Sequence, residues 1–184
     1  HKFELYKSTV YHHPYRGRNK DTHIRIRDEA GKLKLTIKEE TRSKFPIEYE
    51  MNIEDDESME SMLLVLGCVK KHYVEKMREK WLLPYGTEIV FDMYPGCPEY
   101  MEVESICEEI LEEVVNNLGI RKYKGKFGVK DLWRQHFGIN NITKSKEGLT
   151  FENSKDLLKL VKKNRLVFSK LIKKQNQLLL VKNY

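Results

Sequence analysis

The chain has 184 residues, of which 40% are apolar, so it can bury one sizeable core but is too short to favour a second independent domain. Its 34 lysines and arginines outnumber 28 aspartates and glutamates, and the formal net charge of +6 favours anionic partners without choosing among them. No apolar run approaches the roughly twenty residues of a membrane span, and the three separated cysteines argue against a disulfide framework or a structural zinc site. We therefore expect a cytoplasmic protein.

Residues 1–13 carry a weak strand pattern, and a clearer one follows in THIRIRD, where charged and apolar residues alternate with the two-residue period of a strand. The turn EAGK separates this segment from KLKLTIK, which alternates in the same way, so we expect a hairpin joined through Gly31. The polar faces of these two strands carry His23, Arg25, Arg27, Lys34, Thr36 and Lys38.

Four more segments alternate in the same manner, namely PIEYEMNI, VEKMREKW, EIVFDMY and YMEVE, so strand patterns dominate up to about Ser105. The charged residues on the polar faces of these four strands are Glu48, Glu50, Lys76, Arg78, Lys80, Glu88, Asp92, Glu102 and Glu104.

Helices are predicted between and after the strands. The first covers about 56–67, and the second covers 106–118, with Ser105 and Glu108 as a capping box and Gly119 as the stop signal. The apolar stripe of the second helix consists of Ile106, Ile110, Val114 and Leu118.

A shorter helix is expected at 129–137 and a longer one from about residue 155, in a basic, leucine-rich segment that continues to Tyr184. We therefore divide the chain into a barrel domain at 1–153 and a basic helical extension at 154–184. The lysines of the extension could bind nucleic acid electrostatically. However, the segment lacks the interleaved aromatic residues of a base-stacking surface, so a solvated helix is the preferred interpretation.

The alternation leaves open which strand face is buried, and in antiparallel sheets the charged face usually points to water. At least two amphipathic helices nevertheless need an apolar surface to cover, in a chain too small to give them a separate core. The helices have such a surface if the apolar strand faces lie under helices and loops while the charged faces line the inside of a barrel. Because buried charges are unfavourable unless paired, hydrated or bound to an ion, such an interior indicates a binding function.

Six ordered motifs, HIRIR, LTIK, IEYE, EKMR, FDMY and PEYMEVE, resemble those of the CYTH superfamily, also called the triphosphate tunnel metalloenzymes. The resemblance spans about Thr9 to Leu118, with a weaker echo in GVKDLWRQHFGI. It implies an α+β fold built on an antiparallel, closed, eight-stranded tunnel β-barrel with a charged lumen and flanking amphipathic helices. Members of the family act on triphosphates with a divalent metal.

Carried over by position, the resemblance also implies roles for individual residues. Glu48 and Glu50 resemble a central acidic pair, and one of them is our candidate for orienting an attacking water. The metal, Mg²⁺ or Mn²⁺, would be bound by Asp92, Glu102 and Glu104; the last two, two residues apart on one strand face, suit hard oxygen ligation. The residues expected to bind phosphate are Arg25, Arg27, Lys38, Lys76, Arg78 and Lys130, the last on a helix that plugs one tunnel mouth.

The resemblance fails at the family's first strand, whose Glu-x-Glu-x-Lys motif is absent, because FELYK has Glu4 and Lys7 at the wrong spacing. The segment TVYHHP resembles the family's second strand instead. We therefore expect a further strand upstream of His1, without which half of the metal site would be missing.

The resulting hypothesis is metal-dependent hydrolysis of inorganic tripolyphosphate, thiamine triphosphate, or a nucleoside or RNA 5′-triphosphate. Two alternatives stay open. The same residues could hold ATP in a class IV adenylyl cyclase, although no motif for adenine is visible, or could bind triphosphate or polyphosphate without hydrolysing it. Each charged pair taken alone would more often be an ordinary surface ion pair.

Overall fold

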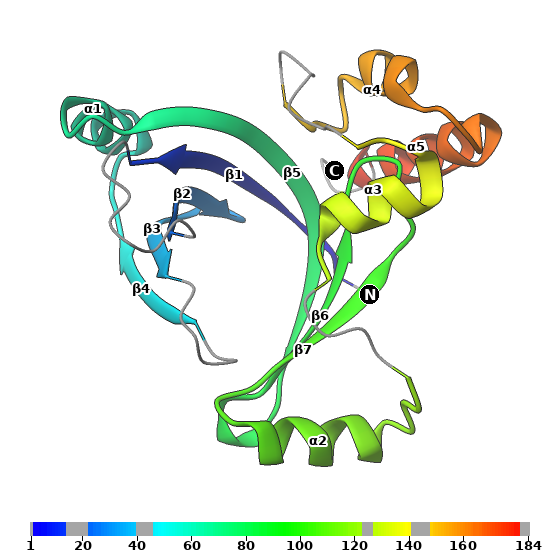
Figure 1. The fold of residues 1–184 in the computed structure, drawn as a ribbon, viewed down its shortest axis with the longest axis horizontal. Coiled ribbons are helices and arrows are strands. Elements are labelled where there is room, and N and C mark those ends of the chain that lie inside the picture. Colours follow the sequence, from blue (N-terminus) through cyan, green and yellow to red (C-terminus); the bar gives the residue numbers. More distant parts are fainter. Residues whose placement is uncertain (1, 14–21, 40–45, 123–126, 141–147, 181–184) are drawn as a thin grey trace. The chain divides into compact units, whose positions relative to one another are not determined.

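The sheet confirms the predicted α+β class. The computed structural model describes residues 2–13, 22–39, 46–122, 127–140 and 148–180. Seven strands are hydrogen-bonded into one sheet, in the order β4-β3-β2-β1-β5-β6-β7 (Figure 1). Pairing is antiparallel between β1 and β2, β2 and β3, β3 and β4, β5 and β6, and β6 and β7. Closure by an eighth strand stays a prediction.

The chain divides into two compact units, which are described separately. The N-terminal unit comprises Leu5–Glu75 and Thr143–Thr150, and the C-terminal unit comprises His1–Glu4, Lys76–Ile142 and Phe151–Tyr184. The long strand β5 (Val69–Leu82) contributes residues to both units. Within the described parts of both units, no helix combines the length and the apolar character needed to cross a membrane.

The N-terminal unit contains the predicted hairpin. Its elements are β1 (Glu4–His12), β2 (Thr22–Glu29), β3 (Lys32–Glu39), β4 (Ile47–Asn52), α1 (Asp56–Val65) and the first half of β5. Ala30 and Gly31 form the turn between β2 and β3, and both have positive φ, 54° and 92°. Two consecutive left-handed residues are what a tight two-residue hairpin loop requires, and Gly31 adopts this conformation without a steric penalty.

Helix α1 covers the apolar face of this part of the sheet. Ile24 and Ile26 of β2 are buried in one cluster with Tyr11 of β1 and Leu63 of α1. The helix is anchored at its start by Asp55, whose side chain accepts the backbone N–H of Ser58 at 2.9 Å. Because strand residues alternate, the charged side chains of β2 lie on the opposite face. In this unit the apolar strand face therefore lies beneath a helix, as the sequence predicts.

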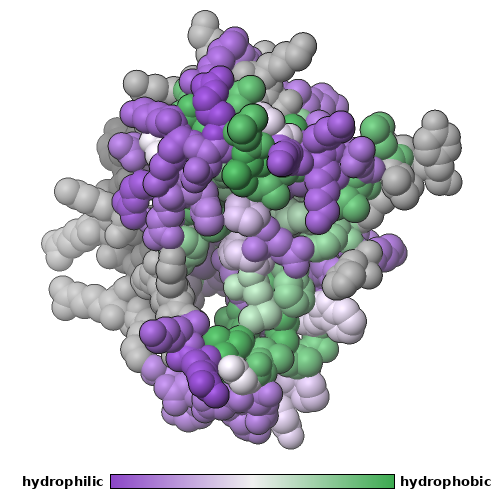
Figure 2. All heavy atoms as spheres, turned by 90° about the vertical axis from the view of Figure 1, so that its right-hand side faces the viewer, coloured by the Kyte–Doolittle hydropathy of each residue, from purple (hydrophilic) through white to green (hydrophobic). Residues whose placement is uncertain are grey.

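The C-terminal unit is built around three aromatic rings on its helices. Its further elements are β6 (Glu88–Met93), β7 (Tyr100–Glu104), α2 (Glu108–Asn117), α3 (Val129–Phe137), α4 (Ser154–Leu160) and α5 (Arg165–Leu180). Trp133 and Phe137 of α3 pack against Phe168 of α5, with ring centroids 5.3 Å apart for the two phenylalanines. Hydrophilic side chains gather on the outer surface over α4 and α5 (Figure 2).

The predicted capping box at the start of α2 is wrong. The helix begins at Glu108 after Cys107, which makes no side-chain cap, and the Ser105 hydroxyl lies 3.1 Å from the hydroxyl of Thr87 instead. The apolar stripe is shifted as well, since Val115 is the buried residue of α2 while Ile106 precedes the helix and is 69% exposed. The sequence spacing therefore predicted the presence of this helix correctly but not the residue at which it begins.

The single long helix predicted from about residue 155 is two helices. Asn164 lies between α4 and α5 with a φ of 57°, in the left-handed region that cannot continue a helix. Its side-chain amide donates a hydrogen bond to the carbonyl oxygen of His136 at 2.8 Å, which ties the break to the end of α3. Asparagine is one of the few residues that adopt this conformation readily.

Candidate functional site

One group of charged side chains lies on the face of β2, β3 and β4 that α1 does not cover. We call it the N-terminal cluster, and it consists of Arg25, Arg27, Glu29, Lys34, Lys38, Glu48 and Glu50. Arg27 pairs with Glu50 through Nη2 and with Glu29 through Nη1, the latter at 3.1 Å. Lys34 pairs with the same two carboxylates, at 2.6 Å to Glu50 and 3.1 Å to Glu29. Two cations thus share two carboxylates.

The two glutamates of β4 differ in how tightly they are held. Burial would raise the pKa of Glu50, but the hydrogen bond from Lys34 and the charge of Arg27 outweigh it and lower that pKa below its ordinary value. Glu48 lies 3.9 Å from the nearest side-chain nitrogens of Arg25, Arg27 and Lys38, beyond hydrogen-bonding distance. Glu50 is therefore fixed as a carboxylate, whereas the oxygens of Glu48 remain able to accept a hydrogen bond from a bound molecule.

A second group lies on one face of β5, β6 and β7. We call it the C-terminal cluster, and it consists of Lys76, Arg78, Lys80, Glu88, Asp92, Glu102 and Glu104. The strand register places Arg78 opposite Asp92 and Glu88 opposite Glu104. All these residues belong to the C-terminal unit. The cluster therefore combines cations with several carboxylates within a single compact body.

Asp92 is the buried centre of the C-terminal cluster. Its side chain is fully buried and accepts hydrogen bonds from Arg78 Nε and Nη2, both at 2.7 Å, and from Lys76 Nζ at 2.9 Å. Burial would raise the pKa of Asp92, but the hydrogen bonds from Arg78 and the charge of Lys76 outweigh it and lower that pKa. Both oxygens of Asp92 are thus engaged by cations.

The protonated form of Lys76 is disfavoured by its surroundings. Burial, together with the positive charge of Arg78, lowers the pKa of Lys76 to about 8 despite the ion pair with Asp92. An added negative charge near this ammonium group would favour its protonated form. The site therefore contains a buried cation that gains from an anionic ligand.

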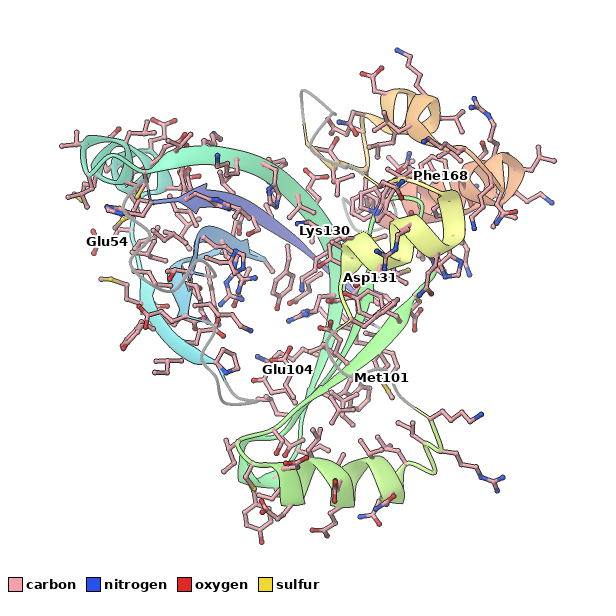
Figure 3. The ribbon with its side chains drawn as sticks, in the orientation of Figure 1. Glu54, Met101, Glu104, Lys130, Asp131 and Phe168 are labelled. Carbon is pink, nitrogen blue, oxygen red and sulfur yellow. The ribbon has the colours of Figure 1, made fainter. Side chains whose placement is uncertain are left out.

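Glu102 and Glu104 are the less satisfied carboxylates of this cluster. Burial, and then the negative charge of Asp92, raise the pKa of Glu102, which lies 3.4 Å from Arg78 Nη2. Glu104 is exposed near the end of β7, where Glu104 and Met101 point to opposite faces of the strand (Figure 3). Among the described residues, no three His, Cys, Asp or Glu side chains are grouped so that they could hold a metal ion. Any metal bound here would take at most two carboxylates from this set.

Two tyrosines lie beside the buried centre. The rings of Tyr94 and Tyr100 are stacked, with centroids 6.1 Å apart and planes inclined by 9°. Lys76 Nζ lies 6.0 Å from the centroid of the Tyr94 ring, at the limit of a cation–π contact. Burial raises the pKa of both hydroxyl groups, so neither is a proton acceptor at neutral pH.

The structure groups ten of the eleven predicted site residues into the two clusters. The exception is Lys130, which is exposed in the first turn of α3 (Figure 3). Four charged members of the clusters, together with the stacked tyrosines, were absent from the predicted set. The charged four are Glu29, Lys34, Lys80 and Glu88. Their signal was available, because each lies two or four residues along its strand from a predicted member and therefore on the same face.

Comparisons with known proteins identify the family of this chain. The sequence matches the CYTH domain over residues 1–131. The chain belongs to the CYTH family. Members of this family act on triphosphates and generally depend on a divalent metal. A comparison with curated proteins found no match.

Solved structures with the same fold include proteins of archaea and bacteria. PH1819 of Pyrococcus horikoshii is 27% identical, covering 73% of this CYTH chain and 88% of that one, with a TM-score of 0.56. PH1012 of the same organism is 19% identical, covering 66% and 77%, also with a TM-score of 0.56. A candidate adenylate cyclase of Bacillus halodurans is 14% identical, covering 70% and 81%, with a TM-score of 0.50.

Proposed function

We propose that this CYTH protein hydrolyses a triphosphate-containing molecule with the help of a divalent metal ion. The observation that carries the proposal is the position of Arg78, which contacts both the buried Asp92 and the partly exposed Glu102. Phosphate-binding cations and metal-binding carboxylates thereby occur on one face of a single unit. Both are needed by an enzyme that acts on a metal–triphosphate complex.

The carboxylates of the C-terminal cluster fit a magnesium or manganese ion better as a pair than as a trio. Asp92 is already neutralised by Lys76 and Arg78, so we assign it the role of positioning these two cations. Glu102 and Glu104 are left as the metal-binding pair. Mg²⁺ commonly takes one or two carboxylates, with waters and substrate phosphate oxygens completing its shell. When bound, the ion would withdraw negative charge from the phosphate oxygens.

The cations of the chain provide the phosphate-binding groups. Lys76 and Arg78 are mostly buried, where a charge-assisted hydrogen bond to phosphate is stronger than in water. Arg25, Arg27 and Lys38 of the N-terminal cluster are half-buried and already oriented by carboxylates. Lys130 is exposed, and we assign it the outermost contact with substrate. Preorganised cations of this kind stabilise the charge that spreads over a transferring phosphoryl group.

Glu48 is the better of the two candidates for orienting the attacking water. Its oxygens lie too far from the neighbouring cations for hydrogen bonds, whereas Glu50 is held by Arg27 and Lys34. In the reaction, the water oxygen forms a bond to the terminal phosphorus while the bond from that phosphorus to the bridging oxygen breaks. A carboxylate that accepts a hydrogen bond from the water contributes on the order of a hundredfold in rate.

Product analysis with the full chain tests this proposal and its alternatives. The chain is incubated with Mg²⁺ or Mn²⁺ and, separately, tripolyphosphate, thiamine triphosphate, ATP and triphosphate-ended RNA. Release of inorganic phosphate from at least one of them supports hydrolysis. Conversion of ATP into cyclic AMP and diphosphate would favour a cyclase, and metal-independent binding without any product would favour a triphosphate-binding protein.

A further inference from the structure

The side chain of Gln175, on α5, holds the turn between β6 and β7. Its amide oxygen accepts the backbone N–H of Gly96 at 2.8 Å. Its amide nitrogen donates to the carbonyl oxygens of Cys97 at 2.9 Å and of Tyr94 at 3.1 Å. Gln175 is buried, with 2% of its surface exposed, so its three hydrogen bonds form away from water. A glutamine that satisfies three backbone groups of one turn fixes the conformation of that turn.

A close packing contact also links the turn to α5. Gly96 has a φ of 73°, and a Cβ atom at this position would lie 1.9 Å from the ring of Phe168, about two helical turns before Gln175. The turn therefore packs its backbone directly against α5. Phe168 is itself fixed by Trp133 and Phe137 of α3. The turn is thus held by the helical core as well as by Gln175.

The turn joins the two strands that carry Asp92, Glu102 and Glu104 of the C-terminal cluster. Asp92 lies two residues before Tyr94, and β7 begins at Tyr100, which pairs with Asp92 across the ladder. The ring of Tyr94 stacks on that of Tyr100, and its centroid lies 6.0 Å from Lys76 Nζ. A shift of the turn would therefore displace Asp92 relative to its partners Lys76 and Arg78. The CYTH match ends at residue 131, so the residue that restrains the turn comes from outside it.

We infer that Gln175 is a positioning residue for triphosphate binding, through which α5 keeps Asp92 and its two cations in place. This inference rests on the proposed function, since it names a residue that supports the same site. Geometric errors of about 1 Å at a site of this kind can cost a hundredfold in activity. We therefore expect that losing the three hydrogen bonds weakens tripolyphosphate binding on the order of tenfold.

Three variants of the full chain test the inference, namely Gln175→Ala, Gln175→Glu and the matched control Gln177→Ala, which changes an exposed glutamine of the same helix. Amide exchange of Gly96 and the NMR signal of Arg78 Nε–H report on the turn and on the Asp92 pair without ligand. Titration with tripolyphosphate without metal reports on binding. We expect Gln175→Ala to accelerate Gly96 exchange, to shift the Arg78 signal and to weaken binding, while Gln177→Ala changes none of them.

Gln175→Glu keeps the side-chain volume and supplies a pH-dependent rescue. An ionised glutamate can accept from Gly96 but cannot donate to the two carbonyl oxygens, whereas a protonated one can donate to one of them. Affinity relative to the wild type should therefore recover as the pH is lowered. If Gly96 exchange accelerates but the Arg78 signal and the affinity stay within twofold of the wild type, the positioning role is disproved. A wild-type chain that fails to bind tripolyphosphate would instead count against the proposed function, while the Arg78 signal would still report on Gln175.

Discussion

Arg78 and Asp92 form a two-point ion pair across β5 and β6, with Nε 2.7 Å from Oδ1 and Nη2 2.7 Å from Oδ2. Paired hydrogen bonds of this geometry fix the plane of the guanidinium group. The same Nη2 also lies 3.4 Å from Oε2 of Glu102. The arginine is therefore oriented before any ligand binds, at a position between a neutralised and an incompletely neutralised carboxylate.

Replacing Asp92 by alanine should destabilise the fold strongly. The change leaves Lys76 and Arg78 partly buried without their counter-ion, and removing one partner of a buried ion pair costs about 3–5 kcal/mol. Urea unfolding measures the loss. Asp156→Ala is the matched control, because Asp156 pairs with Lys159 on the surface of α4, and breaking that pair should change the free energy of unfolding by about 1 kcal/mol or less. Equal effects of the two changes would contradict the account.

The residues of the N-terminal cluster show which features of the site can be predicted from the sequence. Arg25, Arg27 and Lys38 could be assigned to one face because a strand places every second residue on the same side. The sequence also predicted that this charged face lies away from the helices, because an amphipathic helix packs on the apolar strand face, which here carries Ile24 and Ile26. Alternation does not give distances, however. The difference between the fixed Glu50 and the loosely held Glu48 depends on cross-strand geometry.

Gln175 was not predictable for a different reason. A glutamine on a lysine-rich helix looks like a solvated residue, and only the packing of α5 against the turn at Gly96 reveals three buried hydrogen bonds. The break at Asn164 was missed in the same way, because asparagine is compatible with a helix and its left-handed conformation is selected by a bond to His136. Contacts between distant segments decide both cases.

The affinity for tripolyphosphate should depend on the charge of Lys76. The pKa of Lys76 is lowered to about 8, so the group is protonated and able to bind phosphate below this pH and becomes neutral as the pH rises above it. Metal-free titrations between about pH 7 and pH 10 should show weaker binding at the alkaline end. This range runs from about one unit below the pKa to about two units above it. Lys76→Arg keeps its charge throughout the range and should show a smaller loss. A parallel decline in both proteins would exclude Lys76 as the cause.

Glu48 and Glu29 should respond differently to neutralisation. Glu48→Gln removes the carboxylate proposed to orient water, and kcat should fall on the order of a hundredfold with little change in KM. Glu29→Gln removes a carboxylate that contacts Arg27 and Lys34 and serves as the matched control, which should retain most of its kcat. Steady-state phosphate release with tripolyphosphate measures both. Loss of kcat in Glu29→Gln to the same extent would indicate that the role of Glu48 is structural.

The most direct test of the central claim is phosphate release from tripolyphosphate by the full chain, with Mg²⁺ or Mn²⁺, in the wild type and in Glu104→Ala. Glu113→Ala, which changes an exposed glutamate of α2, is the control. The account predicts metal-dependent release by the wild type and the control, and nearly complete loss in Glu104→Ala. Tripolyphosphate that is bound but never cleaved by the wild type, or release that persists in Glu104→Ala, would contradict it.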